Sequence, residues 1–340
     1  MATNASGREY KLIIGKQDQS ALAIGGDGDL ADADFVSGTR LFMRVDQING
    51  INYDAGFTTS EVLRSGRRTY EDGDMIRHYG SGTWSFDFDY LVENKVMLQT
   101  LMSLALDIAD TTGTITVTPA VANATNDYSH AKGGTDDRVG IVLLEASTSG
   151  LSGDDHIMHS AVLNNLTLSM SMGTDGGRLR TSGSFYSGYK PIVKDSGVTG
   201  ATTASDYEKG IFDCTSISIG GHSVTCSDFS ITITNEAQRV GFQGSSGEAD
   251  GYVRGGLYDI SGSITVKYDA DTADALADWK ANTAYAIAVN DGGNFSFSIP
   301  NARMTAHNIN FADEGVFVEI PFTATTGAAA DGNLAVFKTF

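Results

Sequence analysis

Two histidines and two aspartates stand close together in a pattern that could hold a metal ion. Asp154 and Asp155 precede His156 and His159, and on one helical turn their side chains could share a zinc-type site. No third set of ligands follows nearby in the sequence. The pattern is therefore more typical of a solvated polar turn, and we expect no metal.

The other candidate chemistry is also incomplete. The acidic run Asp27, Asp29, Asp32 and Asp34 could attract calcium, but it lacks the loop glycine and bidentate glutamate of an EF-hand. The glycine-rich stretches carry no phosphate-loop Lys and Ser/Thr, and no serine lies in a nucleophile elbow. We therefore predict a protein that is not an enzyme and needs no cofactor.

The two cysteines, Cys214 and Cys226, are too few for a disulfide framework. A bridge between them stays open if they face each other across a hairpin, although a reducing compartment disfavours it.

The charge balance of the 340 residues is strongly acidic. Lys and Arg total 23 against 42 Asp and Glu, a formal charge of −19. This charge argues against a nucleic-acid clamp, which needs a basic surface, but not against a surface that DNA passes without adhering. No stretch reaches the ~20 apolar residues of a membrane span, and residues 1–7 do not resemble a signal peptide. We expect synthesis in the cytoplasm.

A strand followed by a helix is predicted twice. The first copy is strand 83–90 and helix 91–106, and the second is strand 261–268 and helix 271–281. Tyr90 and Tyr268 end the two strands 178 positions apart. A repeat of this length indicates a duplicated domain.

The first of these strands alternates clearly. Trp84, Phe86, Phe88 and Tyr90 share one face, and Ser85, Asp87 and Asp89 share the other. Such alternation predicts a half-buried antiparallel strand. Closing hairpins are predicted over residues 163–186 and 299–324. Within 107–160, strands 114–118 and 139–145 are predicted to pair.

These patterns predict a mainly β protein, with two tandem β-sandwich or partly closed barrel modules, each flanked by one helix. We divide the chain into an N-terminal arm (1–35), a first module (36–190) with an insertion (107–160), a linker (191–208), a second module (209–327) and a C-terminal tail (328–340).

A polar loop with mixed charge precedes the alternating strand in each copy. The loops span 64–80 and 239–256, and their charged residues could pair across an interface between subunits, although internal pairing is common for such charges. The candidate contacts are Arg64, Arg67, Arg68, Glu71, Asp72, Asp74, Arg239, Glu248, Asp250 and Arg254.

Taken together, the closing hairpins, the helix after an alternating strand and the polar loop before it resemble the tail tube proteins of long-tailed bacteriophages. The resemblance covers roughly residues 36–190 and 209–327. It implies six wall domains per ring, stacked rings that form a tube for DNA, and a long loop that contacts the adjacent ring. It also implies other tail proteins as partners: tape measure, terminator and baseplate.

The leading interpretation is a tail tube subunit of the virion that assembles in the host cytoplasm and passes DNA without specific binding. Two modules per chain predict three chains per ring, with Ser85, Asp87 and Asp89 facing the lumen and insertion 107–160 outside the wall. Two alternatives remain: a tandem β-sandwich adhesin or carbohydrate binder, and another virion part with the same fold, such as a terminator or baseplate hub.

Overall fold

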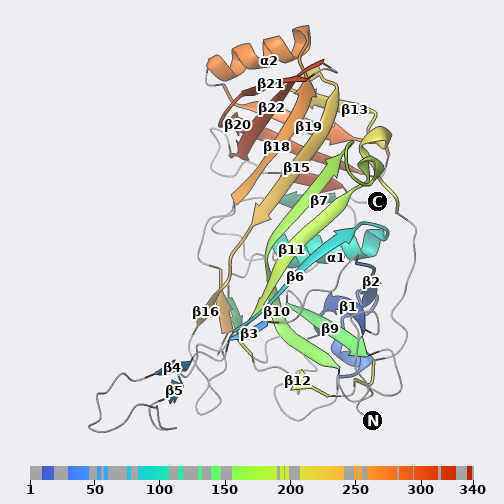
Figure 1. Cartoon of the computed structure of the whole chain (residues 1–340), viewed down its shortest axis with the longest axis vertical. Helices are drawn as coiled ribbons and strands as arrows, with labels where there is room; N and C mark the ends of the chain where they lie inside the picture. The colour runs from blue at the N-terminus through green and yellow to red at the C-terminus, as the bar shows by residue number, and fades with distance from the viewer. Residues whose placement is uncertain are drawn as a thin grey trace.

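The structure is a computed structural model of the chain. It describes residues 10–18, 30–45, 52–54, 57–59, 75–77, 83–106, 114–117, 129–131, 139–146, 155–189, 192–194, 196–198, 207–240, 249, 251–254, 259–281, 283–293, 295–312, 315–326 and 335–338. The described part is mainly β, as predicted, and elongated (Figure 1).

We define the first module as the elements from β1 to β12. Its strands are β1 (Tyr10–Lys16), β2 (Leu41–Met43), β3 (Asn52–Asp54), β4 (Phe57–Thr59), β5 (Met75–Arg77), β6 (Thr83–Leu91), β7 (Thr114–Val117), β8 (Ser129–Ala131), β9 (Gly140–Ala146), β10 (His156–Ser171), β11 (Arg180–Ser187) and β12 (Ile192–Val193). Its helix is α1 (Lys95–Leu106), and short 3-10 turns lie at Asp32–Asp34 and Asp175–Gly177.

The second module runs from β13 to β23. Its strands are β13 (Ser216–Ile219), β14 (His222–Ser223), β15 (Cys226–Thr234), β16 (Gln238–Val240), β17 (Gly251–Val253), β18 (Asp259–Lys267), β19 (Tyr285–Asn290), β20 (Ser296–Met304), β21 (Asn308–Ala312), β22 (Gly315–Ala324) and β23 (Ala335–Lys338). Its helix is α2 (Ala270–Lys280), and a 3-10 turn at Ile211–Asp213 precedes it in the chain.

Eight strand pairings of the first module recur in the second. In order, β1–β2, β1–β9, β9–β10 and β10–β11 correspond to β13–β14, β13–β19, β19–β20 and β20–β22. Likewise, β10–β12, β3–β6, β6–β11 and β4–β5 correspond to β20–β23, β15–β18, β18–β22 and β16–β17. Since strand order, direction and connectivity all recur, the described fold contains one topology twice.

Three of the described pairings join the modules to each other. In the first, β10 pairs with β15 over seven positions, from Asn165 opposite Thr234 to Ser171 opposite Asp228. The others join β7 to β23 and β8 to β17. One sheet therefore runs through both modules in the order β3–β6–β11–β10–β15–β18–β22–β20 (Figure 1). Among the described strands these pairings do not close into a barrel.

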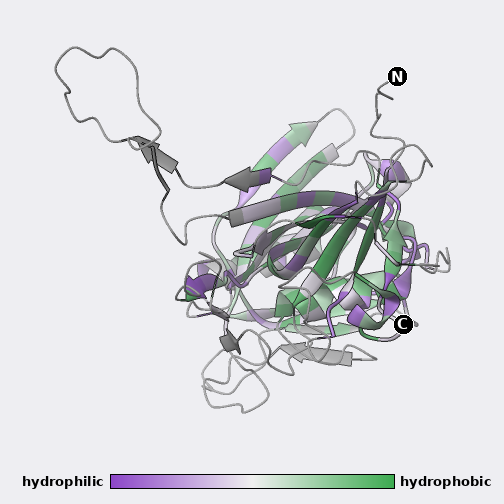
Figure 2. Ribbon diagram, turned by 90° about the horizontal axis from the view of Figure 1, so that it is seen from below, coloured by the Kyte–Doolittle hydropathy of each residue, from purple (hydrophilic) through white to green (hydrophobic). Residues whose placement is uncertain are grey.

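The core lies on the apolar side of this sheet. Alternate residues of β6, β11, β10, β15, β18 and β22 are buried there, and α1 packs against β10. In α1 all residues from Met97 to Leu106 are buried. Seen along the long axis, hydrophobic strands fill the centre of the molecule (Figure 2). Burial of side chains at about 25 cal/mol per Å² is the main stabilising contribution to such a layer.

The structure corrects several predicted boundaries. Residues 10–16 are not an arm, because β1 pairs with β9 and its residues Leu12 to Ile14 are buried. Strands β12 and β23 lie in the predicted linker and tail, yet they pair with β10 and β20 at corresponding places. Segments of two and four residues are too short to be identified as strands without their partners.

The predicted insertion is also only partly an insertion. β9 corresponds to β19 of the second module and is a core strand, and it pairs with β1 and β10 instead of β7. What lacks a described counterpart is β7 and β8. Both pair with strands of the second module, so this segment connects the modules.

The two tyrosines that suggested the repeat are not equivalent. The bounds of β6 and β18 differ by 176 positions (83 to 259 and 91 to 267), as do those of β5 and β17 (75 to 251 and 77 to 253). Tyr90 is buried inside β6, whereas Tyr268 follows the end of β18 and is 40% exposed. The duplication is therefore real, but its spacing along these strands is 176 and not 178.

Candidate functional site: the polar face of the continuous sheet

One side of the continuous sheet carries a row of small hydroxyl side chains. We call it the hydroxyl face. One line across six strands runs through residues that pair in register: Asp89, Ser182, Thr167, Thr232, Ser261 and Thr323. The pleat makes this face possible, because residues two apart share a side and the other set faces the core.

Hydrogen bonds connect the hydroxyls across the strands. The Oγ1 atoms of Thr167 and Thr232 are 2.9 Å apart, which spans the junction between the modules. The Oγ atoms of Ser230 and Ser263 are 3.2 Å apart. Ser171 donates to the carboxylate of Asp228 at the same junction. The face is thus uninterrupted where the two modules meet.

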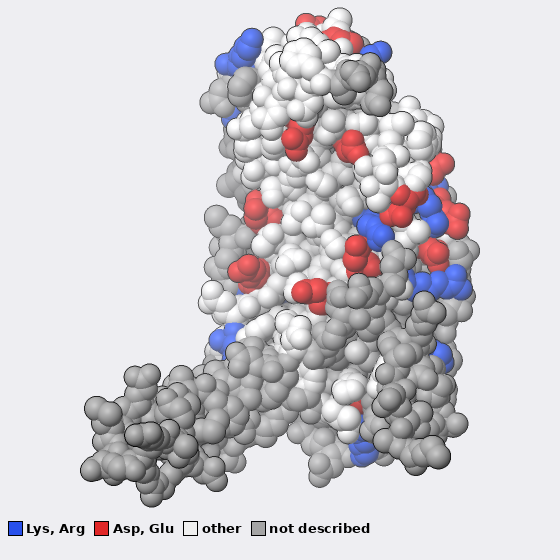
Figure 3. All heavy atoms as spheres, viewed as in Figure 1, with Lys and Arg blue, Asp and Glu red and all other residues white. Residues whose placement is uncertain are grey.

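The charges on this face are mostly acidic. Its described acids are Asp87, Asp89, Asp228, Asp259 and Glu319, and its described bases are Arg180, Lys267 and Arg303. The Arg180 guanidinium lies 3.1 Å from Asp89 and 3.0 Å from Asp175, so neighbouring carboxylates offset its charge. In the space-filling view acidic groups are spread over this side, including its middle, and most of the basic groups lie toward its edges (Figure 3).

The three residues predicted to face the lumen lie on the hydroxyl face. Asp87 and Asp89 are exposed, and Ser85 is half-buried. Their apolar neighbours Trp84, Phe86, Phe88 and Tyr90 are buried on the other side. The alternation read from the sequence is therefore present in β6.

Most of the predicted loop contacts lie outside the described residues: Arg64, Arg67, Arg68, Glu71, Asp72, Asp74, Glu248 and Asp250. The two that are described, Arg239 and Arg254, lie at the base of the β16–β17 hairpin. Arg239 is half-buried on β16, opposite Tyr252.

Arg254 is not a surface contact, which corrects its predicted role. It is 1% exposed, and its guanidinium donates to three backbone carbonyls. Nη2 donates to Leu104 in the last turn of α1 at 3.2 Å, and Nη1 donates to Leu163 of β10 at 3.3 Å. Nη1 also donates to Asn235. A cation is favourable at the end of a helix, where carbonyls lack partners within the helix.

Tyr252 fixes the same hairpin to the first module. Its hydroxyl accepts a hydrogen bond from the Gly188 amide at 2.8 Å, and burial holds its pKa above the ordinary value. Its ring packs edge-on to Tyr186 and Tyr189, at 6.0 and 5.9 Å between centroids. Sequence reasoning missed this contact, because a lone tyrosine in a polar loop gives no signal of its partner.

The predicted metal candidates are used for structure. His156 and His159 lie on strand β10 and not on a helical turn; His159 is buried against Tyr189, with ring centroids 5.4 Å apart. Asp155 accepts amides of Ala146 and Ser196 at 2.7 and 2.8 Å, while Asp154 lies outside the described residues. Within the part that is described, no group of three His, Cys, Asp or Glu could hold a metal.

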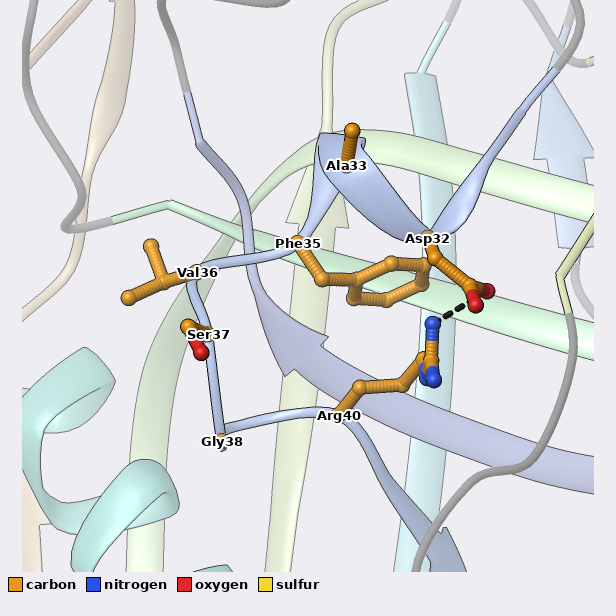
Figure 4. Close-up of a pocket in the computed structure, with 7 residues that line it drawn as sticks. All are labelled: Asp32, Ala33, Phe35, Val36, Ser37, Gly38 and Arg40. Carbon is orange, nitrogen blue, oxygen red and sulfur yellow. Dashed lines mark ion pairs between the residues drawn. The ribbon is translucent and has the colours of Figure 1, made fainter.

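Of the acidic run near the N-terminus, Asp32 lines a pocket together with Ala33, Phe35, Val36, Ser37, Gly38 and Arg40 (Figure 4). Asp32 pairs with Arg40, whose guanidinium also lies 5.9 Å from the Phe35 ring centroid. Asp34 accepts the Ala31 amide at 2.7 Å. Asp27 and Asp29 lie outside the described residues. The described carboxylates therefore stabilise this turn, and the pocket offers no unpaired charge to a ligand.

Both cysteines are free thiols. Burial is the main cause that raises the pKa of Cys214 to about 11 and that of Cys226 to about 12. Since the thiolate is the reactive form, neither group is suited to nucleophilic chemistry.

The family model for phage tail tube proteins matches residues 14–324. The chain belongs to the phage tail tube protein family. Family membership makes the protein a structural component of the virion tail. No curated protein matches the chain at a significant level. No helix in the described part of this tube protein is long and apolar enough to cross a membrane.

Proposed function

We propose that this tail tube protein assembles into rings of three chains, that the rings stack into a hollow tube, and that the tube conducts DNA at ejection. The observation that carries the proposal is the β10–β15 pairing. It joins two copies of one topology, edge to edge, into a single sheet. A joint of this kind, repeated between chains, would build a closed wall of alternating first and second modules.

The size of such a wall agrees with a conduit. Each chain supplies eight neighbouring strand positions, from β3 to β20, so three chains supply about 24. At a spacing of about 4.8 Å and a tilt of about 40°, about 24 strands close at a backbone diameter of about 45–50 Å. After side chains are subtracted, a DNA duplex still fits. Six chains with both modules in the wall would double this width.

The hydroxyl face supplies the lining in this proposal. Asp87 and Asp89 are exposed there, and the Ser and Thr side chains between strands are short and hydrogen-bonded to one another. Carboxylates repel phosphate groups within about 8 Å at physiological salt. A wall of this kind lets DNA pass without adhesion, which needs no catalysis and no cofactor.

The loops that begin at the β4–β5 and β16–β17 hairpins are the proposed contacts between rings. Both hairpins occupy the same place in the two modules, before β6 and β18. Arg64, Arg67 and Arg68 with Glu71, Asp72 and Asp74 remain the proposed contacts in the first loop, together with Glu248 and Asp250 in the second. Tape measure, terminator and baseplate proteins are the proposed partners at the tube ends.

The test is electron microscopy of the purified protein with a mass measurement of single rings. Long tubes with three chains per ring are expected. A ring of six chains would refute the shared-wall arrangement, and a lumen lined by net positive charge would refute the lining. Replacing Arg64, Arg67 and Arg68 by Ala should leave folded subunits that stack poorly; normal tubes from this variant would refute the loop assignment.

A further inference from the structure

Strand β21 corresponds to the second half of β10, residues 165–171, which we call its outer half. A bulge separates Met158 from Ala161 where β10 passes β9, and the same irregularity separates Ile299 from Ala302 where β20 passes β19. Met158 and Ile299 are 141 positions apart in the sequence, and so are Ala161 and Ala302. The single strand β10 is thus matched by β20 and β21, with an interruption at residues 305–307.

A second path through the sheet gives the same offset. Asp89 pairs with Ser182, which pairs with Thr167. The counterpart of Asp89, 176 positions later, is Thr265. Thr265 pairs with Glu319, which pairs with Asn308. Thr167 therefore corresponds to Asn308, again 141 positions later.

In the first module the outer half of β10 is covered on both edges. It lies between β11 and β15, and its apolar residues Leu166, Leu168 and Met170 are at most 1% exposed. They align with Ile233, Ile231 and Phe229 of β15, which are also buried. The β15 edge is what completes this core layer.

In the second module the corresponding apolar residues are exposed. Ile309 and Phe311 stand 141 positions after Leu168 and Met170, and they are 44% and 83% exposed. β21 pairs with β22 on one edge, and no other described strand pairs with it. An unpaired edge that carries exposed apolar side chains is a template for another strand.

We propose that β21 is the joint between chains, and that its occupant is the β3 edge of a second copy of this protein. This inference rests on the proposed function. It adds which strand edges meet between chains, that they run antiparallel, and which residues lie opposite each other. β3 is the counterpart of β15: Ser85 pairs with Asn52, and Ser261, 176 positions later, pairs with Thr232. Since Thr167 lies opposite Thr232, the antiparallel joint places Asn308 opposite Asn52 of the neighbour.

Closure follows from the same geometry. Each chain offers one β21 edge and one β3 edge, so contacts run head to tail around the ring. Joints of the β10–β15 kind then alternate with joints of the β21–β3 kind. Ile309 and Phe311 become covered as Leu168 and Met170 are, and the exposed apolar edge is removed.

Cysteine cross-linking tests the register. Directly opposite residues of antiparallel strands have Cα atoms about 4.5–5.5 Å apart, within the range of a disulfide. The variant with Asn52→Cys and Asn308→Cys should form tubes and, on mild oxidation, give covalent dimers and trimers on a non-reducing gel. Cys214 and Cys226 have pKa values raised to about 11 and 12 and should react slowly.

The matched control moves one cysteine along the same strand. Asn52→Cys with Asn310→Cys shifts the pair by two residues, about 7 Å, and should cross-link at least tenfold less. Tubes without cross-links at 52 and 308, or stronger cross-links at 52 and 310, would overturn the joint and leave the proposed function standing. Absence of rings and tubes from the unmodified protein would refute both.

A second experiment tests the apolar contact. Phe311→Asp should give folded chains, with unchanged circular dichroism, that remain monomeric on gel filtration. Phe311→Leu keeps an apolar side chain and should still form rings. Normal ring formation by Phe311→Asp would overturn the proposal.

Discussion

Replacement of Arg254 by Ala should destabilise the subunit strongly. Arg254 is 1% exposed and its guanidinium serves three carbonyls, from Leu104, Leu163 and Asn235. Each buried carbonyl left without a donor costs about 1–3 kcal/mol, with part of this recovered by relaxation and water. We expect a loss of about 3–5 kcal/mol, near the cost of removing one partner of a buried ionic contact.

Thermal unfolding measures this loss. At about 2–4 °C per kcal/mol, the value for domains of about 150–250 residues, Arg254→Ala should lower Tm by roughly 6–20 °C. The matched control is Arg44→Ala. The Arg44–Glu93 ion pair is 3.3 Å long, with Arg44 59% exposed, and such surface pairs contribute about 0–1 kcal/mol. A Tm of Arg254→Ala within 2 °C of the unmodified protein, together with defective tube stacking, would refute the buried role and restore the predicted loop contact.

Three further outcomes are expected. Gly183→Ala should lower Tm, because a Cβ there would lie 2.6 Å from a carbonyl oxygen of the adjacent strand, whereas Gly173→Ala, whose nearest atom is 3.8 Å away, should not. Tyr252→Phe should cost about 1–2 kcal/mol in urea unfolding, because the amide that now bonds its hydroxyl at 2.8 Å loses its acceptor; an unchanged midpoint would contradict this. Burial alone would raise the pKa of Asp291, but its bonds with Lys209 and two backbone amides hold that pKa below the ordinary value. Because its pKa is lowered on folding, ionised Asp291 stabilises the fold above about pH 4, and this stabilisation is lost as the pH falls through the folded-state pKa. Asp291→Asn should therefore have a lower Tm than the wild type at pH 7, and the difference in Tm should narrow below about pH 4.

Local patterns were sufficient to predict the elements and their repetition. Strand 83–90 and helix 91–106 appear as β6 and α1 with shifts of a few residues, because period-two and period-3.6 burial are written in neighbouring residues. The polar face that carries Ser85, Asp87 and Asp89 follows from the same alternation. The duplication was visible for that reason too, since each copy must bury the same kind of face.

Which strands pair, and which residues end up buried between them, was decided only by tertiary structure. β1, β12 and β23 are too short or too weakly patterned to identify alone, and they are strands because β9, β10 and β20 offer them hydrogen-bonding edges. Arg254 reads as a loop charge in the sequence. It is buried because three carbonyls, from residues 19 to 150 positions away in the chain, converge on its guanidinium. The repeat spacing of 176 and the β10–β15 joint have the same origin, since register depends on contacts between residues far apart in the sequence.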